Sequence, residues 1–551
     1  MAKDRVEMET DEVRIADLRK GLSGSDATLD TPFGRKPLLY ADYTASGRSV
    51  EAVEAVMSAL SVDYANPHTE DSATGRASNA WMREAEARIK SAVNAGPEDC
   101  LIPCASGATG AIHKLQEILG LAIPPATRDR LGGLAEREAD TVVFIGPYEH
   151  HSNELSWRES LADTVTIPLD ERGGLDMAAL EQALADPRHA GKRKIGAFSA
   201  ASNVTGVKTD VRALARLLHA HEAVFCLDCA ASAPYLPIDM HPEGDEGARI
   251  DAVYFSPHKF VGGPGSCGLL LFDRALYRTD LPPTQSAGGT VRYVWPGGHD
   301  FIEDVEARER AGTPGLPQLV RAALALQLQD EIGHGTIEAR EHAALLRAFG
   351  TWQAHPRIEI LGPADPDRRI GIVSFNLRGA DGALVPPRLV TVLLNDLFGI
   401  QSRAGCSCAG PYGHALLGLD MASSMEIRER VLAGETGARP GWCRVSLHWL
   451  MSDEEIDYLI EAVAFLAEHA ACFAGLYDCD PQTGAWSWGG EEGIDAPVFP
   501  ARLLSGEGRV KAVDCECCSA GALRSAALCE AHELAARFGA GAENRAAGMA
   551  V

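Results

Sequence analysis

The chain has 551 residues, of which 46% are hydrophobic and 23% are charged, and this composition is typical of a globular protein. Its net charge of −26 repels phosphate backbones, so we expect no nucleic-acid partner. The N-terminus has no apolar signal core and no apolar run is long enough to span a bilayer, so we expect a cytoplasmic protein with no membrane partner. Most of the 14 Cys are scattered singly, which favours buried or reactive thiols over a disulfide framework.

Four parts can be distinguished along the chain. Residues 1–37 form a polar N-terminal extension with one short helix, and residues 38–317 form a large domain. Residues 318–475 form a smaller α+β domain, and residues 476–551 are a Cys-containing tail. Because the tail is rich in Ala and Gly and has few large apolar residues, we expect it to be poorly ordered.

Short apolar runs alternate with helical stretches from Cys100 to about Phe272 in the large domain. This alternation predicts an α/β fold with a mainly parallel sheet. Ligands of such sheets bind at the carboxyl ends of the strands, so the residues that follow each run are the first candidates for a site. The runs that predict buried strands are Thr141–Ile145, Thr164–Ile167, Ile195–Ser199, Val224–Leu227, Ala252–Phe255 and Gly268–Phe272.

The smaller domain begins with an amphipathic helix predicted over about Gln318–Glu331. Its remaining segments mix strand-like and helix-like patterns, which indicates an α+β unit. Strands are predicted at Arg357–Ile360, Arg369–Asn376 and Trp442–Leu447, and helices at Pro387–Leu397 and Asp453–Phe473.

A polar corner follows the strand expected at Ile250–Phe255. It contains Ser256, His258 and Lys259 and leads through a Gly-rich turn to the strand expected at Gly268–Phe272. An amine held at the mouth of a sheet can form a Schiff base with an aldehyde cofactor, and pyridoxal phosphate (PLP) uses a Lys in this way. The alternative is a hairpin with a surface Lys, because Lys is usually exposed.

Three more polar segments follow predicted strands. Ser106 and Thr109 lie at the start of a helix, where hydroxyl and backbone N–H groups bind phosphate well. His150 could lie flat on an aromatic cofactor, bind a metal together with His151, or be a hydrogen-bonded surface residue. Asn203 can hydrogen-bond a ring hydroxyl, although Asn is also a common turn residue.

Asp228 is the sharpest of these signals, because it places a carboxylate at the end of a wholly apolar strand. A buried carboxylate without a partner is costly, so Asp228 should face a cation. The protonated ring nitrogen of PLP is such a cation. A helix N-cap is the alternative role for this residue.

Segment 401–414 in the smaller domain is predicted to be a mobile loop with two thiols, Cys406 and Cys408, beside Arg403. A nearby positive charge increases the thiolate fraction of a Cys. The Cys-x-Cys spacing is a poor zinc site in isolation, because no second Cys pair lies at a suitable distance, and we expect no metal site. Arg444 could clamp a substrate carboxylate or form a structural ion pair.

These segments follow one another as in class V, fold-type I PLP enzymes, and the sequence resembles the cysteine desulfurase and selenocysteine lyase branch from about Leu38 to Phe473. The resemblance implies an α/β large domain with a seven-stranded, mostly parallel sheet, and a small α+β domain. It also implies PLP as the cofactor. It further implies a homodimer in which Gly288-Gly289-Thr290 reaches the phosphate of the neighbouring subunit.

The resemblance also assigns roles to residues. Lys259 matches the residue that carries PLP, and Cys408 aligns with the nucleophile that accepts sulfur. His150 matches the stacking imidazole, Asp228 the partner of the ring nitrogen and Asn203 the partner of the ring hydroxyl. The remaining matches are Ala108, Thr109, Ser256, His258 and Thr290 for the cofactor, and Arg403 and Arg444 for the nucleophile and the substrate carboxylate.

The sequence departs from the family pattern at two positions. Ala231 stands where the family usually has Gln, which weakens the hold on the ring oxygen. Cys406 stands where the family has His, and the Gly-Cys-x-Cys pattern is closer to the desulfurase-like domain of molybdenum-cofactor sulfurases. The tail has no counterpart in the family, and its thiols are candidates for binding a metal or relaying sulfur: Cys515, Cys517, Cys518 and Cys529.

The activity that the resemblance implies is PLP-dependent removal of sulfur from L-cysteine, which leaves alanine and a persulfide on Cys408. A sulfur-acceptor protein is then a candidate partner. One alternative is another class V reaction on a different amino acid (aminotransferase, epimerase or selenocysteine lyase). The other is a non-catalytic sulfur-carrier or metal-binding protein that uses the Cys cluster of the tail, and the presence of Lys259, Asp228 and His150 argues against it.

Overall fold

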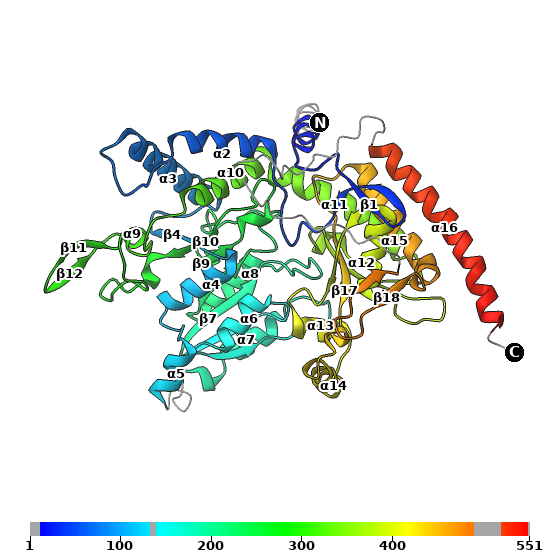
Figure 1. Ribbon diagram of the computed structural model, residues 1–551. Coiled ribbons are helices and arrows are strands. Elements are labelled where there is room, and N and C mark those ends of the chain that lie inside the picture. The colour runs from blue at the N-terminus through cyan, green and yellow to red at the C-terminus, as the bar shows by residue number, and fades with distance from the viewer. Residues whose placement is uncertain (1–11, 133–138, 490–519, 549–551) are drawn as a thin grey trace.

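A seven-stranded sheet forms the centre of the larger part of the molecule (Figure 1). The structure is a computed structural model that describes residues 12–132, 139–489 and 520–548. Six strands of the sheet run parallel and β10 runs opposite to them, which confirms the expectation of a seven-stranded, mostly parallel sheet. In spatial order the strands are β4 (Asp99–Cys104), β10 (Gly268–Asp273), β9 (Ala252–Phe255), β8 (Val224–Asp228), β7 (Arg193–Ser199), β5 (Thr141–Ile145) and β6 (Asp163–Thr166).

Helices cover both faces of this sheet, which explains why its strands are apolar on both sides. Strands β5 and β9 are buried at every residue. Phe144 and Val253 belong to the apolar cluster on one face, and Val143 and Tyr254 belong to the cluster on the other. The first face is covered by α3 (Ala73–Ala92), α7 (Met177–Leu184), α8 (Val211–Ala220) and α10 (Leu316–Ile332), and the second by α4 (Gly107–Ile118) and α6 (His151–Arg158).

A second, four-stranded antiparallel sheet lies in the part of the chain that follows α10. Its strands are, in spatial order, β13 (Ile358–Ile360), β14 (Ile372–Leu377), β17 (Trp442–Ser446) and β16 (Arg403–Gly405). Its apolar cluster also takes side chains from α11 (His334–Trp352), α12 (Pro387–Phe398) and α15 (Asp453–Ala474). The short strand β3 (Leu39–Tyr40) pairs in parallel with β15 (Ile400–Gln401), and the backbone N–H of Ser446 in β17 donates to the carbonyl of Ala41 at 2.8 Å, so this early segment contacts the second sheet.

Segment 401–414 is not the loop that the sequence predicted. Residues 403–405 form β16, which is hydrogen-bonded to β17, and α13 (Gly410–Leu416) follows after a turn. The strand was missed because it has three residues, and its Gly and Arg are not strand formers.

The other elements are α2 (Glu51–Asp63), α5 (Pro125–Leu131), α9 (Val305–Arg308), α14 (Met421–Leu432), and the hairpins β1 (Thr28–Thr31)–β2 (Gly34–Pro37), β11 (Val291–Trp295)–β12 (Gly298–Phe301) and β18 (Tyr477–Cys479)–β19 (Trp486–Trp488). Among the helices described, none is both long and apolar enough to cross a bilayer.

The tail contains a long helix, α16 (Ala520–Gly548), and the prediction that the tail is poorly ordered is wrong for this segment. The helix packs on α15, α12 and β2, and it lies along the outer side of the second sheet (Figure 1). Three small residues of α16 are buried against these elements: Ala527, Ala531 and Ala535. Of the Cys in the tail, Cys479 is exposed and Cys529 is exposed on α16, whereas Cys515, Cys517 and Cys518 lie outside the described residues.

Candidate functional site

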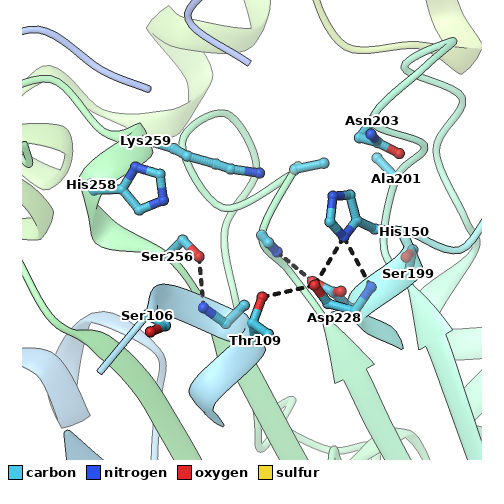
Figure 2. Close-up of a pocket in the computed structure, with 14 residues that line it drawn as sticks. Ser106, Thr109, His150, Ser199, Ala201, Asn203, Asp228, Ser256, His258 and Lys259 are labelled. Carbon is cyan, nitrogen blue, oxygen red and sulfur yellow. Dashed lines mark hydrogen bonds between the residues drawn. The ribbon is translucent and has the colours of Figure 1, made fainter. Parts of the chain in front are cut away.

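A cavity of about 190 Å³ opens where the parallel strands end (Figure 2). Strands β4, β5, β7, β8 and β9 all finish at this edge, so polar residues from five distant segments meet there. The cavity is lined by Ser106, Ala108, Thr109, His150, Ser152, Ser199, Ala201, Asn203, Asp228, Ala230, Ala231, Ser256, His258 and Lys259. Eight of the predicted site residues therefore lie together.

Lys259 ends a short 3-10 turn, Pro257–Lys259, that follows β9. Its amine points into the cavity from the side opposite His150 (Figure 2). Burial lowers the pKa of Lys259 to about 8, although the nearby Asp228 carboxylate acts in the opposite direction. A substantial fraction of the amine is therefore neutral just above neutral pH, and a neutral amine is the form that attacks a carbonyl.

Asp228 is the last residue of β8, and its side chain is buried at the base of the cavity. The backbone N–H of Ala230 donates to Oδ1 at 2.8 Å. Burial raises the pKa of Asp228 to about 6, while the hydrogen bond from Ala230 and the charge of Lys259 oppose this rise. A cation in the cavity would stabilise the carboxylate form.

His150 is the N-cap of α6, and Nδ1 of its ring accepts a hydrogen bond from the backbone N–H of Ser152 at 3.1 Å. Burial and the nearby charge of Lys259 lower the pKa of His150 to about 4. The ring is therefore neutral at physiological pH, with its remaining proton on Nε2. A neutral, flat imidazole is suited to stacking on another aromatic ring.

The N-terminus of α4 forms one wall of the cavity. Ser106 and Gly107 precede the helix in the left-handed region, with φ of 61° and 63°. The hydroxyl of Ser256 accepts a hydrogen bond from the backbone N–H of Ala108 at 2.8 Å. The Thr109 hydroxyl lies at the cavity surface beside Ser152. The hydroxyl groups of Ser106, Thr109 and Ser256 and the ring of His258 line the cavity at this helix N-terminus. Such an arrangement is suited to binding a phosphate.

Asn203 connects the cavity to the second sheet. Its side-chain Nδ2 donates to the backbone carbonyl of Ser407 at 2.7 Å, and its backbone carbonyl accepts a hydrogen bond from Arg444 at 3.0 Å. Among the described residues, Oδ1 of Asn203 is buried and has no hydrogen-bond partner. A buried polar atom without a partner in a cavity indicates that a bound group would complete its hydrogen bonding.

The two predicted arginines share one carboxylate, which the sequence reasoning missed. Nε of Arg403 donates to Oδ2 of Asp42 at 2.9 Å, and a terminal nitrogen of Arg444 donates to Oδ1 at 3.1 Å. Arg444 and the side chain of Asp42 are largely buried, whereas Arg403 is half-exposed. Asp42 lies two residues after the end of β3, and a carboxylate after a strand was the only signal that could have revealed it.

The two loop thiols differ in exposure, since Cys408 is exposed and Cys406 is half-buried. Ser407 and Cys408 both adopt the left-handed region, with φ of 52° and 55°. Cys408 does not line the cavity, but its neighbour Ser407 is hydrogen-bonded to Asn203, which does. Within the described part of the chain, no three His, Cys, Asp or Glu side chains are placed to share a metal ion.

Thr290 is another predicted residue that this chain does not bring to the cavity, in addition to Cys408, Arg403 and Arg444. It is buried just before the β11–β12 hairpin, and its hydroxyl donates to the carbonyl of Ala287 at 2.8 Å. The adjacent Gly288 and Gly289 lie at or near the surface.

Sequence reasoning also missed Glu149, Ser152 and Ser199. Both Glu149 oxygens are engaged: Oε1 accepts from the backbone N–H of Ser199 at 2.9 Å, and Oε2 from its hydroxyl at 2.6 Å. Burial raises the pKa of Glu149 to about 7, against the effect of these hydrogen bonds. Glu149 thus ties the end of β5 to the end of β7 beneath the cavity.

The residues of the cavity fit the cofactor expected from the sequence. An amine, a carboxylate and a neutral imidazole surround its centre, and hydroxyl groups at a helix N-terminus lie at one end. The backbone is also closely packed there, because a Cβ at Gly268 would lie 2.1 Å from the carbonyl oxygen of Gly107. This donor set matches the aldehyde, the ring nitrogen and the phosphate of PLP.

Comparison with known proteins gives a consistent result. The family model described as aminotransferase class-V matches residues 39–459. A curated relative from Halalkalibacterium halodurans, named "probable cysteine desulfurase", is 28% identical over 389 residues, which cover 70% of this chain and 87% of the relative. One from Streptomyces coelicolor with the same name is 27% identical over 379 residues, which cover 68% of this chain and 84% of the relative.

Solved structures show the same fold. The apo structure of a cysteine desulfurase from Thermococcus onnurineus has a TM-score of 0.64 at 22% identity, and the match covers 82% of this chain and 98% of that one. A cysteine desulfurase from Escherichia coli has a TM-score of 0.57 at 21% identity, with coverage of 77% and 93%.

Proposed function

Because this chain belongs to the aminotransferase class-V family, we propose that it is a PLP-dependent cysteine desulfurase, which takes sulfur from L-cysteine and leaves alanine. The observation that carries the proposal is the position of the Cys408 loop. Asn203 lines the cavity and donates a hydrogen bond to Ser407, so the exposed thiol of Cys408 is attached to the mouth of the cofactor site.

PLP supplies an aldehyde that holds an amine covalently and a ring that takes up electrons from the bonds of a bound amino acid. Lys259 would hold the aldehyde, and the phosphate would lie among the N–H groups and hydroxyls of α4, Thr109 and Ser256. His150 would stack on the ring, and the carboxylate of Asp228 would keep the ring nitrogen protonated. Asn203 would bond the ring hydroxyl.

The residues of the chain have the chemistry that the reaction needs. The neutral form of the Lys259 amine, favoured by its lowered pKa, can remove a proton from Cα of the substrate. Arg444 would bind the substrate carboxylate. The thiolate of Cys408 attacks the substrate sulfur, the C–S bond breaks and the carbon takes up a proton. Two thiols thus become a persulfide and alanine, so the sulfur is oxidised while the carbon is reduced.

A homodimer is part of this proposal. The β11–β12 hairpin projects from the molecule next to Thr290 (Figure 1), and it exposes 63% of Tyr293, 60% of Val294 and 42% of Trp295. Such an apolar patch is unusual on a monomer and suits a subunit interface. In the dimer, the Gly288–Thr290 segment would reach the phosphate site of the partner subunit through its glycines, which lie at or near the surface. We also propose a cytoplasmic enzyme and a sulfur-acceptor protein that takes the persulfide sulfur.

The experiment that tests the function compares Cys408→Ser with Cys406→Ser in an assay for sulfide, alanine and protein persulfide from L-cysteine. We expect Cys408→Ser to keep the cofactor absorption band and to lose persulfide and most sulfide release, while Cys406→Ser loses much less. Full activity of Cys408→Ser would show that the thiol is not the sulfur acceptor. An amino-acid panel assayed for keto acids then tests the alternative, another class-V reaction, which the absence of Cys408 from the cavity lining favours.

A further inference from the structure

A reciprocal pair of hydrogen bonds joins the N-termini of α6 and α13, and the proposed reaction gives it no role. The backbone N–H of His151, the first residue of α6, donates to the carbonyl of Cys408 at 2.8 Å. In return, the backbone N–H of Gly410, the first residue of α13, donates to Nε2 of the His151 ring at 3.0 Å. One histidine therefore holds the backbone on both sides of Ala409, directly after the Cys408 thiol.

The backbone that His151 holds is in an unfavourable conformation. Ser407 and Cys408 are consecutive residues with a Cβ in the left-handed region, where contacts of the Cβ are poor. Such a conformation persists only when the surroundings impose it. The surroundings here are the two bonds of His151 and the bond from Asn203 to the Ser407 carbonyl at 2.7 Å.

The hydrogen bond from Gly410 also defines the state of the His151 ring. Because a backbone N–H can only donate, Nε2 of His151 must be the acceptor, and a neutral ring carries its proton on Nδ1. His150 has the opposite tautomer, since its Nδ1 accepts from Ser152. The two adjacent histidines thus serve different partners: His150 faces the cavity and His151 holds the thiol loop.

We propose that His151 is a positioning residue that fixes the Cys408 loop at the mouth of the cavity, so that the thiol meets the substrate sulfur in one geometry. This inference rests on the proposed function, in which Cys408 accepts the sulfur. His151 touches the loop backbone and does not line the cavity, so its effect on the reaction passes through the loop. Its loss should lower kcat for L-cysteine while KM and the cofactor absorption band stay the same.

Hydrogen exchange followed by mass spectrometry tests the proposal on the protein purified with its cofactor. His151→Leu removes the acceptor of the Gly410 N–H, whereas the amide oxygen of His151→Gln can replace Nε2. Loss of one hydrogen bond shifts a local opening equilibrium by about 2- to 10-fold. We expect exchange in the peptide that covers 403–413 to be faster by about this factor in His151→Leu, and close to wild type in His151→Gln. His113→Leu, at an exposed histidine of α4, is the matched control and should not change it.

Unchanged exchange in His151→Leu, or equal acceleration in His151→Gln, would overturn the proposal. If His151→Leu does not fold, His151→Asn is used in its place, because its shorter side chain cannot reach the N–H of Gly410. If the exchange pattern is as expected but the wild-type protein releases no sulfide from L-cysteine, the proposed function fails and the loop-holding role of His151 stands. If sulfide is released and kcat is insensitive to His151→Leu, the positioning role is wrong.

Discussion

Asp42 sets the charge of the site at the residue scale. Its carboxylate lies between the guanidinium groups of Arg403 and Arg444 and is hydrogen-bonded to both. Together the three side chains carry a net charge of about +1, which one substrate carboxylate would neutralise in the proposed reaction. The group is therefore matched to an amino acid with a neutral side chain, such as cysteine.

Asp42→Asn should shift the selectivity of the enzyme toward dianionic substrates. The two arginines then carry a charge of about +2, so the ratio of kcat/KM for L-cysteine sulfinate to that for L-cysteine should rise by about tenfold. Asp42→Glu keeps the charge and serves as the control. An unchanged ratio in Asp42→Asn would show that Asp42 only orients the arginines.

The buried carboxylate of Asp228 lowers the stability of the protein when no cofactor is bound. Because the folded pKa is raised from 3.8 to about 6, the buried carboxylate destabilises the cofactor-free protein. This cost is fully present above pH 6 and disappears as the pH falls toward 4. At pH 7.5 it amounts to at most about 3 kcal/mol.

Asp228→Asn should therefore raise the free energy of unfolding of the cofactor-free protein at pH 7.5. The gain should shrink to about half at pH 5, and the same variant should bind PLP more weakly. Urea unfolding at both pH values measures the gain, and a cofactor titration measures the binding. A gain that is equal at the two pH values would mean that the effect is not electrostatic.

Several site residues could be predicted from the sequence because they follow apolar strands. Lys259, Asp228 and His150 each come within a few residues of a strand that is apolar throughout. Asp42 and Glu149 also follow strands, but their roles in the site could not be predicted from that position alone. Their partners, Arg444 and Ser199, lie 402 and 50 residues away, and no local pattern encodes such contacts.

At the scale of elements, α16 shows that amino-acid composition alone did not predict an ordered helix in the tail. Its many Ala and Gly residues suggested a poorly ordered tail, yet Ala is the best helix former and small side chains allow close packing. Among the described side chains, ion pairs connect the helix to the rest of the molecule: Glu530 with Lys36 at 2.6 Å, and Arg524 with Glu455 at 2.6 Å. Lys36 is 1% exposed, so Glu530 is the partner of a buried cation.

Glu530→Gln should lower the free energy of unfolding by about 1–3 kcal/mol, because the amine of Lys36 would remain buried without its counter-charge. Urea unfolding of the full chain measures the loss. Glu533→Gln, at an exposed position of the same helix, should leave the free energy unchanged. Equal values for both variants would show that α16 contributes little to the stability of the second sheet.

Deletion of residues 520–551 should have a larger effect than either substitution. The deletion exposes apolar side chains of α12 and α15, so we expect lower soluble yield and a lower melting temperature. The measurement is a thermal melt of the truncated and full-length proteins. A soluble truncated protein with an unchanged melting temperature would show that α16 contributes little to the stability of the protein.

At the scale of the whole molecule, the alternation of apolar runs and helices predicted the mainly parallel central sheet, because βαβ units leave a strong pattern. Strands that are short or lie at an edge, such as β16, leave none. The projecting hairpin was not predicted either, since Tyr293 and Trp295 have a meaning only once their exposure is known.

Trp295→Ser together with Tyr293→Ser should shift the protein toward monomer, because the hairpin loses its exposed aromatic side chains. Analytical ultracentrifugation at micromolar concentration measures this change, and Val62→Ser, at another exposed apolar position, is the control. A wild-type protein that is monomeric and fully active at nanomolar concentration would contradict the shared site.

Asp42 is far in sequence from its partners Arg403 and Arg444, and this separation has a consequence for biosynthesis. All cavity-lining residues lie between Ser106 and Lys259, and the central sheet is complete at Asp273. Domains fold in order as they leave the ribosome, and about 170 residues later, roughly 10–30 s at about 5–20 residues per second, Arg444 is translated. The cofactor pocket can therefore form on the nascent chain well before Arg403 and Arg444 are in place beside Asp42. During that interval the chain is able to take up PLP while it still lacks the groups that would bind and turn over cysteine.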